Sequence, residues 1–159
     1  MSGQAALPGP SDDLLLKQKG AYKDIHANSE LSIQERRTAG ITAAWLREQG
    51  YEVTEGVGGT GLVGLLRNGE RATVLLRANM DALPVTENTS LPYASTKTGI
   101  DPSSGQNTGI AHSCGHDMHV TWLMGVTMSS PHTRTSGVAL LSRYSNRGGD
   151  WRGRSGDGR

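Results

Sequence analysis

The chain has 159 residues, enough for one domain of ordinary size, and its 16 basic and 15 acidic side chains give a formal net charge of +1. This balance gives no reason to expect nucleic acid or a charged membrane as a partner, and no apolar run is long enough to span a bilayer. The start lacks the features of a signal peptide, and the single cysteine excludes an internal disulfide, which together favour a reducing, cytoplasmic location.

The N-terminal part of the chain is predicted to form a disordered start followed by a helix. Residues 1–13 are polar and contain proline and glycine, so they are assigned to the disordered start. Between Leu14 and Ile25 the apolar residues recur at helical spacing and indicate an amphipathic helix that runs towards His26. We interpret His26 as a structural residue that ties this helix to the domain, and not as a catalytic one.

A second helix is predicted from Ile33 to Gln49. Ser32 and Glu35 have the spacing of a capping box, in which both side chains bond to free N–H groups at the start of a helix. Gly50 fits the left-handed residue that commonly follows the end of a helix. The local signals therefore bound this helix on both sides.

The hydrophobic period then changes to that of strands. Residues 51–54 and 61–66 are predicted to be short strands, and Asn68-Gly69 is a favourable hairpin turn into a third strand at 72–78. Within that third strand the continuous apolar run 74–76 is typical of a strand buried on both faces. Helix, strand, hairpin and buried strand together indicate an α/β domain.

A predicted polar loop over 86–107 leads to the segment 109–119, Gly-Ile-Ala-His-Ser-Cys-Gly-His-Asp-Met-His, which holds the only cysteine and three of the five histidines. Cys114 and His116 stand two apart, so in an extended backbone both side chains would point the same way and could bind one ion. Thiolate and imidazole suit zinc or a neighbouring transition metal. A catalytic zinc site normally takes three protein ligands, so further ligands must come from elsewhere.

The residues near this pair have ordinary as well as functional interpretations. His112 and His119 are weaker candidates, since each could form hydrogen bonds behind the ligands or face solvent. Asp117 could support the metal or stabilise the start of a helix predicted from that residue. Asp81 could be a turn residue before Pro84, but functional groups of α/β sheets gather where strands end.

Three segments together carry a resemblance to a known family. Residues 24–32, 76–85 and 109–119 occur in the order and spacing seen in metal-dependent N-acyl-amino-acid amidohydrolases. Over residues 14–126 the chain resembles the aminoacylase/carboxypeptidase metallopeptidase family, which includes hippurate hydrolase and the auxin-conjugate hydrolases. The resemblance implies a zinc-peptidase-like, three-layer α/β sandwich with a mixed sheet, of which residues 14–128 would form an incomplete, N-terminal part.

The resemblance also implies an activity and a site. Cys114 and His116 match metal ligands of the family, and Asp81 matches an aspartate that supports its catalytic centre. The implied reaction is hydrolysis of the amide bond of a small N-acyl amino acid, with a divalent ion such as zinc, manganese, cobalt or nickel. Such an ion lowers the pKa of its bound water and polarises the scissile carbonyl, while a glutamate moves the proton. The full-length enzymes of the family are often dimers.

Beyond the His/Cys segment the chain departs from the family. No glutamate occurs after Glu87, and His132 is the only histidine after His119, so the family's Glu-Glu pair and later ligands are absent from this sequence. Asn79 stands where the family usually has an aspartate. We therefore expect a truncated, inactive fragment of an amidohydrolase. The alternatives are a non-catalytic metal-binding remnant and a hydrolase that uses Cys114 as its nucleophile.

The last segment, residues 129–159, is predicted to be disordered, because its end has few large apolar residues. One allowed choice of codons for Asn146–Arg159, read one base later, encodes TAEETGEGARAMV, which contains a Glu-Glu pair like that of the family. This suggests the hypothesis that the reading frame changes between Thr127 and Arg134. Resequencing the coding region tests it.

Overall fold

The structure is a computed structural model, and it describes residues 11–67, 73–129 and 136–142. Its helices are α1 (Asp12–Ala27), α2 (Arg36–Glu48) and α3 (His116–Ser129). Its strands are β1 (Glu52–Val57), β2 (Gly61–Leu66), β3 (Thr73–Asn79), β4 (Thr98–Ile100), β5 (Asn107–Gly109) and β6 (Ser136–Ser142). None of the described helices combines the length and the hydrophobicity that crossing a membrane requires.

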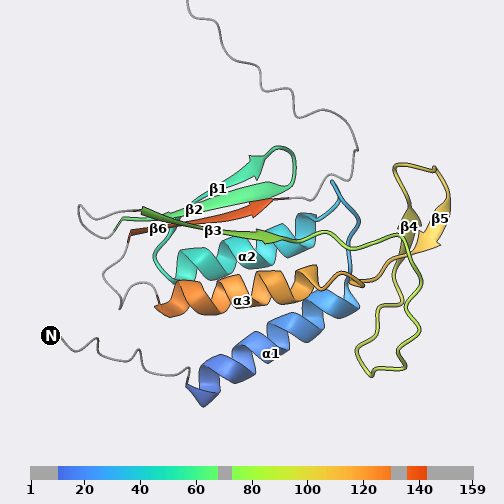
Figure 1. The fold of residues 1–159 in the computed structure, drawn as a ribbon, viewed down its shortest axis with the longest axis horizontal. Helices are drawn as coiled ribbons and strands as arrows, with labels where there is room; N and C mark the ends of the chain where they lie inside the picture. The colour runs from blue at the N-terminus through green and yellow to red at the C-terminus, as the bar shows by residue number, and fades with distance from the viewer. Residues whose placement is uncertain (1–10, 68–72, 130–135, 143–159) are drawn as a thin grey trace, which may run out of the picture.

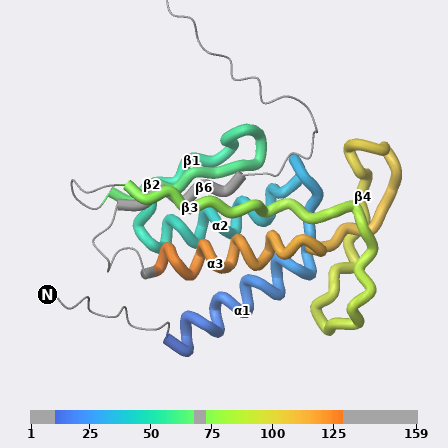
Figure 2. The backbone as a smooth tube through the Cα atoms, in the orientation of Figure 1, coloured from blue at the N-terminus to red at the C-terminus, as the bar shows by residue number. Residues whose placement is uncertain are grey.

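Four strands form a mixed sheet in the order β1-β2-β6-β3, in which β6 is antiparallel to β2 and parallel to β3. All three helices lie on one face of this sheet (Figure 1). α2 and α3 lie next to the sheet, and α1 lies beyond α3 (Figure 2). The short hairpin of β4 and β5 stands apart from the sheet, at the end where β3 leads into the loops (Figure 1). The predicted α/β class with a mixed sheet is confirmed.

The main core lies between the sheet and the helices. Its fully buried side chains include Ile25 of α1, Leu46 of α2, Leu62 of β2 and Met124 of α3. The helix predicted from Asp117 is present, and Val120, Leu123 and Met124 are buried in this core as expected, while Val126 is exposed. Burial of these apolar side chains is the main force that holds the helices on the sheet.

α1 begins slightly earlier than predicted. The backbone N–H of Leu14 donates to the side chain of Ser11 at 3.3 Å, so Ser11 is the N-cap and the helix includes two residues that were assigned to the disordered start. Leu14 and Ile25 are buried, as the helical spacing indicated. His26 is also buried, close to the end of the helix.

The start of α2 differs from the predicted capping box. The helix begins at Arg36, Glu35 makes no side-chain bond to its backbone, and Ile33 has a φ of 72°. This left-handed residue turns the chain just before the helix and carries Glu35 into the interior, so the capping-box prediction is wrong. At the other end Gly50 has the expected positive φ, of 81°.

The cap of α2 comes from Glu30 instead. Its carboxylate accepts hydrogen bonds from the backbone N–H groups of Arg37 at 2.9 Å and Thr38 at 2.8 Å, and from the Thr38 hydroxyl at 2.8 Å. A carboxylate at the start of a helix satisfies free N–H groups and is favoured by the helix dipole. The sequence pattern therefore placed the capping glutamate five residues too late.

The predicted hairpin between the second and third strands is wrong. β2 and β3 are not neighbours, because β6 lies between them and pairs with both. Asn68-Gly69, the predicted turn, lies outside the described residues. β6 itself falls in the segment 129–159 that was predicted to be disordered, of which 143–159 lie outside the described residues. The sequence of β6 contains Val-Ala-Leu-Leu, a short apolar run that is typical of a central strand.

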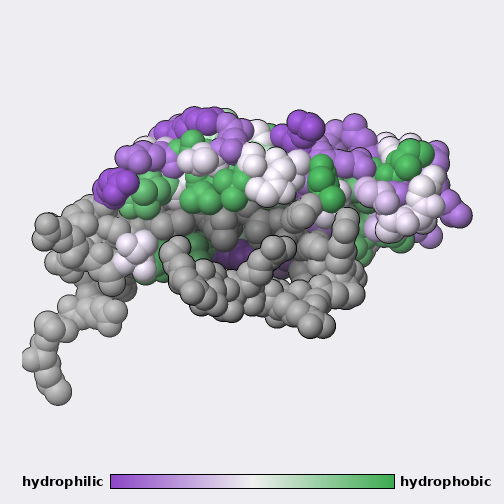
Figure 3. All heavy atoms as spheres, turned by 90° about the horizontal axis from the view of Figure 1, so that it is seen from above, coloured by the Kyte–Doolittle hydropathy of each residue, from purple (hydrophilic) through white to green (hydrophobic). Residues whose placement is uncertain are grey.

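β3 is not buried on both faces, contrary to the prediction for 74–76. Leu75 is 61% exposed and Val74 46% exposed, while Leu76 is half-buried. The helices cover only one face of the sheet, and β3 is an outer strand among the described ones. Hydrophobic side chains are also visible between hydrophilic ones on the opposite side of the molecule, which Figure 3 shows from above. The described part is therefore an incomplete sandwich.

Candidate metal centre

Asp81 lies just after the end of β3, where three segments of the chain meet. Ala82 bridges to Leu31, which precedes α2, and Leu83 bridges to Ala111, which precedes α3. The backbone around Asp81 is thus held on both sides, and its side chain is 5% exposed. This position at the end of a sheet strand is the one that the sequence indicated for a functional aspartate.

His116 is the first residue of α3 and is held by Asp81. Its Nδ1 lies 2.8 Å from the main-chain oxygen of Asp81 and 3.1 Å from the carboxylate Oδ1. Both oxygens accept, so the proton of a neutral His116 belongs on Nδ1 and the lone pair is left on Nε2. A histidine with a carboxylate behind one nitrogen is the usual arrangement of a metal ligand. The geometry supports the roles predicted for both residues.

Cys114 lies in a turn and not in an extended strand. Residues 113–115 form this turn, Gly115 has a φ of 72°, and the thiol is exposed. The prediction that an extended backbone points Cys114 and His116 the same way is therefore wrong, because the chain bends between them to enter α3. Within the described residues, no three His, Cys, Asp or Glu side chains are grouped so that they could hold a metal ion.

His112 is buried beside this turn, and both of its ring nitrogens lack a hydrogen-bond partner. Burial lowers the pKa of His112 to about 4, although the carboxylates of Asp117 and Asp81 oppose the shift. His112 is therefore a neutral imidazole at pH 7. The hydrogen bond that the sequence suggested for it is not formed by the described residues.

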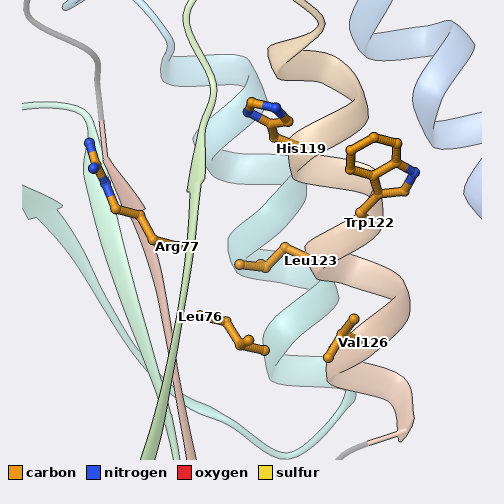
Figure 4. A pocket seen from close by; sticks show the side chains of 6 residues that line it. All are labelled: Leu76, Arg77, His119, Trp122, Leu123 and Val126. Carbon is orange, nitrogen blue, oxygen red and sulfur yellow. The ribbon is translucent and has the colours of Figure 1, made fainter.

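His119 lies one turn of α3 after His116, with 5.3 Å between the two ring centroids, and Trp122 follows at 6.0 Å from His119. A shallow cavity of about 250 Å³ opens beside them, lined by Leu76, Arg77, His119, Trp122, Leu123 and Val126. Figure 4 shows His119 near one end of it, and Arg77 extending from β3 away from the helix. His119 thus borders an apolar groove next to the candidate centre.

Asp117 stabilises the start of α3, as one of its two interpretations predicted. Its Oδ1 accepts a hydrogen bond from the backbone N–H of Met118 at 2.9 Å within the first turn. Its Oδ2 lies 2.7 Å from Nδ1 of His26, and Nε2 of His26 lies 3.1 Å from Oε1 of Glu87. His26 therefore ties α1 to α3, as predicted, and also to the loop after β3.

The ionisation of this buried network follows from its hydrogen bonds. Burial alone would lower the pKa of His26, but its bonds with Asp117 and Glu87 outweigh burial and raise it. Burial likewise would raise the pKa of Glu87, yet hydrogen bonds from the Thr89 hydroxyl, the Ser95 backbone N–H and His26 lower it. Sequence reasoning missed Glu87, since a single acid in an irregular loop carries no periodic signal.

Glu35 is a second acid that no sequence pattern connected with the site. It is fully buried, its Oε2 accepts from the Thr60 hydroxyl at 2.5 Å, and its Oε1 has no hydrogen-bond partner among the described residues. Burial raises the pKa of Glu35, and the nearby charge of Asp81 adds to the rise. Its position near Asp81 depends on the turn at Ile33, which no side-chain pattern indicated.

The residues present fit a divalent transition metal in part. The thiol of Cys114 and the imidazole of His116 are donors of the kind that such ions prefer, and His116 is already oriented by Asp81. A complete centre needs at least one more protein ligand than this pair supplies. Cys114 and His116 therefore offer two of the donors that such a centre would need.

Comparison with known proteins agrees with this geometry. Residues 75–140 match Peptidase family M20/M25/M40. The chain is 46% identical over 101 residues to hippurate hydrolase of Campylobacter jejuni, a match that covers 63% of this chain and 24% of the relative. It is 45% identical over 105 residues to thermostable carboxypeptidase 1 of Saccharolobus solfataricus, a match that covers 65% of this chain and 24% of the relative. The chain thus spans about a quarter of the length of these curated relatives.

Among solved structures, the fold is similar to that of a Bacillus subtilis protein described as a dinuclear metal binding peptidase from the M20 family. The TM-score is 0.70 with 28% sequence identity, and the match covers 82% of this chain and 36% of the other.

The family match continues to residue 140, past the segment between Thr127 and Arg134 where a change of frame was suggested. The hypothesis of a change of frame stays a prediction. The codon argument for Asn146–Arg159 concerns residues beyond both the match and the described part, and it stays a prediction. The motifs, the fold and the sequence matches agree on peptidase family M20/M25/M40, whose model matches residues 75–140 of this chain.

Proposed function

We propose that the chain is part of a metal-dependent hydrolase that cleaves the amide bond of N-acyl amino acids. The observation that carries this proposal is His116, which is held by Asp81 through Nδ1 at the start of α3, so that Nε2 can bind a metal. The name of the Campylobacter relative supports the substrate class, since hippurate is an N-acyl amino acid.

The roles that we propose for the individual residues follow from the geometry. Cys114 and His116 would hold a divalent ion, which supplies a polarised carbonyl and an activated water when bound. Asp81 orients the imidazole of His116 and, through its negative charge, makes the ring a stronger donor. Zinc, manganese, cobalt and nickel all suit a thiolate and an imidazole, so the metal is proposed only as a divalent transition ion.

A cobalt titration tests the ligand roles. We expect the wild-type chain to bind Co²⁺ with the thiolate-to-metal absorption that a cysteine ligand produces, and Cys114→Ser to lose this band. His116→Ala should weaken binding by at least about tenfold, the effect of losing a major ligand contact. Ser113→Ala, a change in the same exposed turn, is the matched control and should bind as the wild type does. Equal binding by all four proteins would contradict the assignment.

We further propose that the 159-residue chain by itself has negligible amidase activity. The sequence has no glutamate after Glu87, so the carboxylate that would move the proton in the family mechanism is missing. The measurement is hippurate hydrolysis by the purified chain with zinc, manganese, cobalt or nickel, compared with a chelator control. Robust turnover that depends on added metal would contradict this part of the proposal.

A second candidate is a non-catalytic metal-binding remnant. It is favoured by the finding that no three suitable donors are grouped within the described residues. A cysteine-nucleophile hydrolase has less support, because no histidine hydrogen bonds with the exposed Cys114 in the described part of the chain. Hydrolysis that survives a chelator but is lost in Cys114→Ser would favour that mechanism over both metal-dependent ones.

A further inference from the structure

His26 lies between two buried carboxylates that belong to different parts of the fold. Its Nδ1 is 2.7 Å from Oδ2 of Asp117 in α3, and its Nε2 is 3.1 Å from Oε1 of Glu87 in the loop after β3. The side chain of His26 is 10% exposed, that of Asp117 2% and that of Glu87 5%. One imidazole therefore joins α1, α3 and the loop away from solvent.

The two contacts set the protonation of the ring. A carboxylate oxygen only accepts hydrogen bonds, and a neutral imidazole has only one N–H to donate, so both contacts are satisfied only when His26 is an imidazolium. The ring centroids of Tyr22 in α1 and Tyr93 in the loop lie 5.6 and 5.4 Å from the ring centroid of His26. Two further titratable groups of the described residues lie near it: the ring centroid of His112 is 6.5 Å from that of His26, and Lys23 lies over the Tyr93 ring.

Both carboxylates lead directly to the candidate metal centre. Asp117 follows His116 in sequence and accepts from the N–H of Met118, so it is fixed in the first turn of α3. Glu87 accepts from the N–H of Ser95 at 2.6 Å and so holds the loop that leaves Asp81. Of the two residues that His26 joins, Asp117 is thus the sequence neighbour of His116, and Glu87 holds the loop that continues from Asp81.

We propose that His26 is a positioning residue for the candidate metal centre: held between Asp117 and Glu87, it fixes the first turn of α3 and the loop after Asp81, and with them the orientation of His116. The inference rests on the proposed function only for the ligand role of His116. The arrangement of the three side chains is independent of metal binding, so the two can be tested separately.

The chain offers a matched control for packing between the same helices. The side chain of Gln18, also in α1, donates to the main-chain oxygen of Thr121 in α3 at 3.0 Å. Gln18→Ala removes a tie between α1 and α3 without touching either carboxylate. His26→Gln replaces the two separate ring N–H donors by one amide nitrogen and one amide oxygen, so one of the two carboxylates faces an oxygen that cannot donate. The added change Glu87→Gln supplies an amide N–H from which the oxygen of the new glutamine can accept.

The experiment is nitrogen-15 NMR of the histidine rings in the metal-free full chain, with circular dichroism as a check of folding. We expect both ring nitrogens of His26 to be protonated at pH 7 in the wild type, and His116 to show a single tautomer with the proton on Nδ1. His26→Gln should convert His116 to a mixture of tautomers while the helix content is unchanged. Gln18→Ala should keep the single tautomer, and His26→Gln with Glu87→Gln should restore it.

Two results would overturn the proposal. One is an unchanged His116 signal in His26→Gln, and the other is the same disturbance in Gln18→Ala, which would reduce the role of His26 to packing. A cobalt titration of the same proteins then tests metal binding separately from the orientation of His116. Binding at least tenfold weaker in His26→Gln than in Gln18→Ala supports the positioning role. Absence of cobalt binding by the wild type would contradict the proposed function, while the NMR result would stand.

Discussion

A histidine is costly to bury without partners, and His112 is buried with two unpartnered ring nitrogens. Its depressed pKa, about 4, means that the folded chain holds it neutral while the unfolded chain binds a proton below pH 6.5. As the pH falls from 6.5 towards 4, the unfolded state is therefore favoured. This single residue can remove about 3 kcal/mol of stability over that window.

We expect His112→Leu to reduce this loss. An apolar side chain needs no hydrogen bonds and takes up no proton, so the variant should be about 1–3 kcal/mol more stable at pH 7.5 and should lose less stability on acidification. Urea unfolding of both proteins at pH 7.5 and pH 5 is the measurement. Parallel losses in the two proteins would show that the protonation of His112 does not govern the acid sensitivity.

Glu30 gives a second prediction at the scale of one residue. Its carboxylate accepts three hydrogen bonds at the start of α2, so Glu30→Ala should lower the free energy of unfolding by about 1–2 kcal/mol. Glu48→Ala, which removes an exposed carboxylate from the other end of the same helix, is the control and should change stability by less than about 0.5 kcal/mol. Equal effects would argue against the cap.

The sequence predicted most of the candidate site but not its surroundings. Asp81 and His116 were found because their motifs are short and specific, and the structure places them in contact. Glu30 caps α2 in place of Glu35 because Ile33 adopts a left-handed conformation, which its side chain does not signal. Glu87 contacts His26 only through the tertiary fold, so a reading along the chain had no means to pair them.

At the scale of elements, local patterns located the helices and three of the six described strands, but not the partners of those strands. The boundaries of β2 agree with the predicted 61–66, and α1 and α2 agree within a few residues. The pairing of β2 with β6 could not be foreseen, because a favourable Asn-Gly turn describes only adjacent residues. An apolar run likewise indicates a strand but not whether an element covers both faces, as the exposure of Leu75 shows.

Substitutions at two glycines test how closely these elements approach one another. A Cβ at Gly109 of β5 would lie 2.6 Å from the backbone Cα of Thr86, which cannot move by itself. A Cβ at Gly125 of α3 would meet only the flexible end of the Gln18 side chain. We expect Gly109→Ala to lower the melting temperature clearly more than Gly125→Ala, with a cost of about 2 kcal/mol or more. The reverse order would contradict the close contact of β5 with the loop.

At the scale of the whole molecule, one face of the sheet stands out. The helices cover the opposite face, and Leu75, which alternates with the core-packed Leu76 in the outer strand β3, is 61% exposed. A strand at the edge of a sheet with apolar neighbours is a site for association with other chains. The purified chain is therefore expected to self-associate at high concentration.

Leu75→Lys tests this expectation. A charge on the exposed face of an edge strand opposes pairing between molecules and should increase the monomer fraction measured by light scattering, with little loss of stability. Thr73→Lys is the control, since it adds the same charge at an exposed position near the start of the strand without removing an apolar side chain. A smaller gain in monomer is expected for it. No difference between the wild type and Leu75→Lys would contradict an apolar origin of the association.

The position of β6 between β2 and β3 has a consequence for how the protein is made. During synthesis the chain emerges from its N-terminus, so β1 and β2 can form their hairpin early, while β3 emerges without the neighbour it will pair with. Its apolar residues then remain exposed until Ser136–Ser142 leave the ribosome. Nascent chains that stall within α3 would carry this unpaired strand, and we expect them to recruit chaperones that bind extended apolar segments.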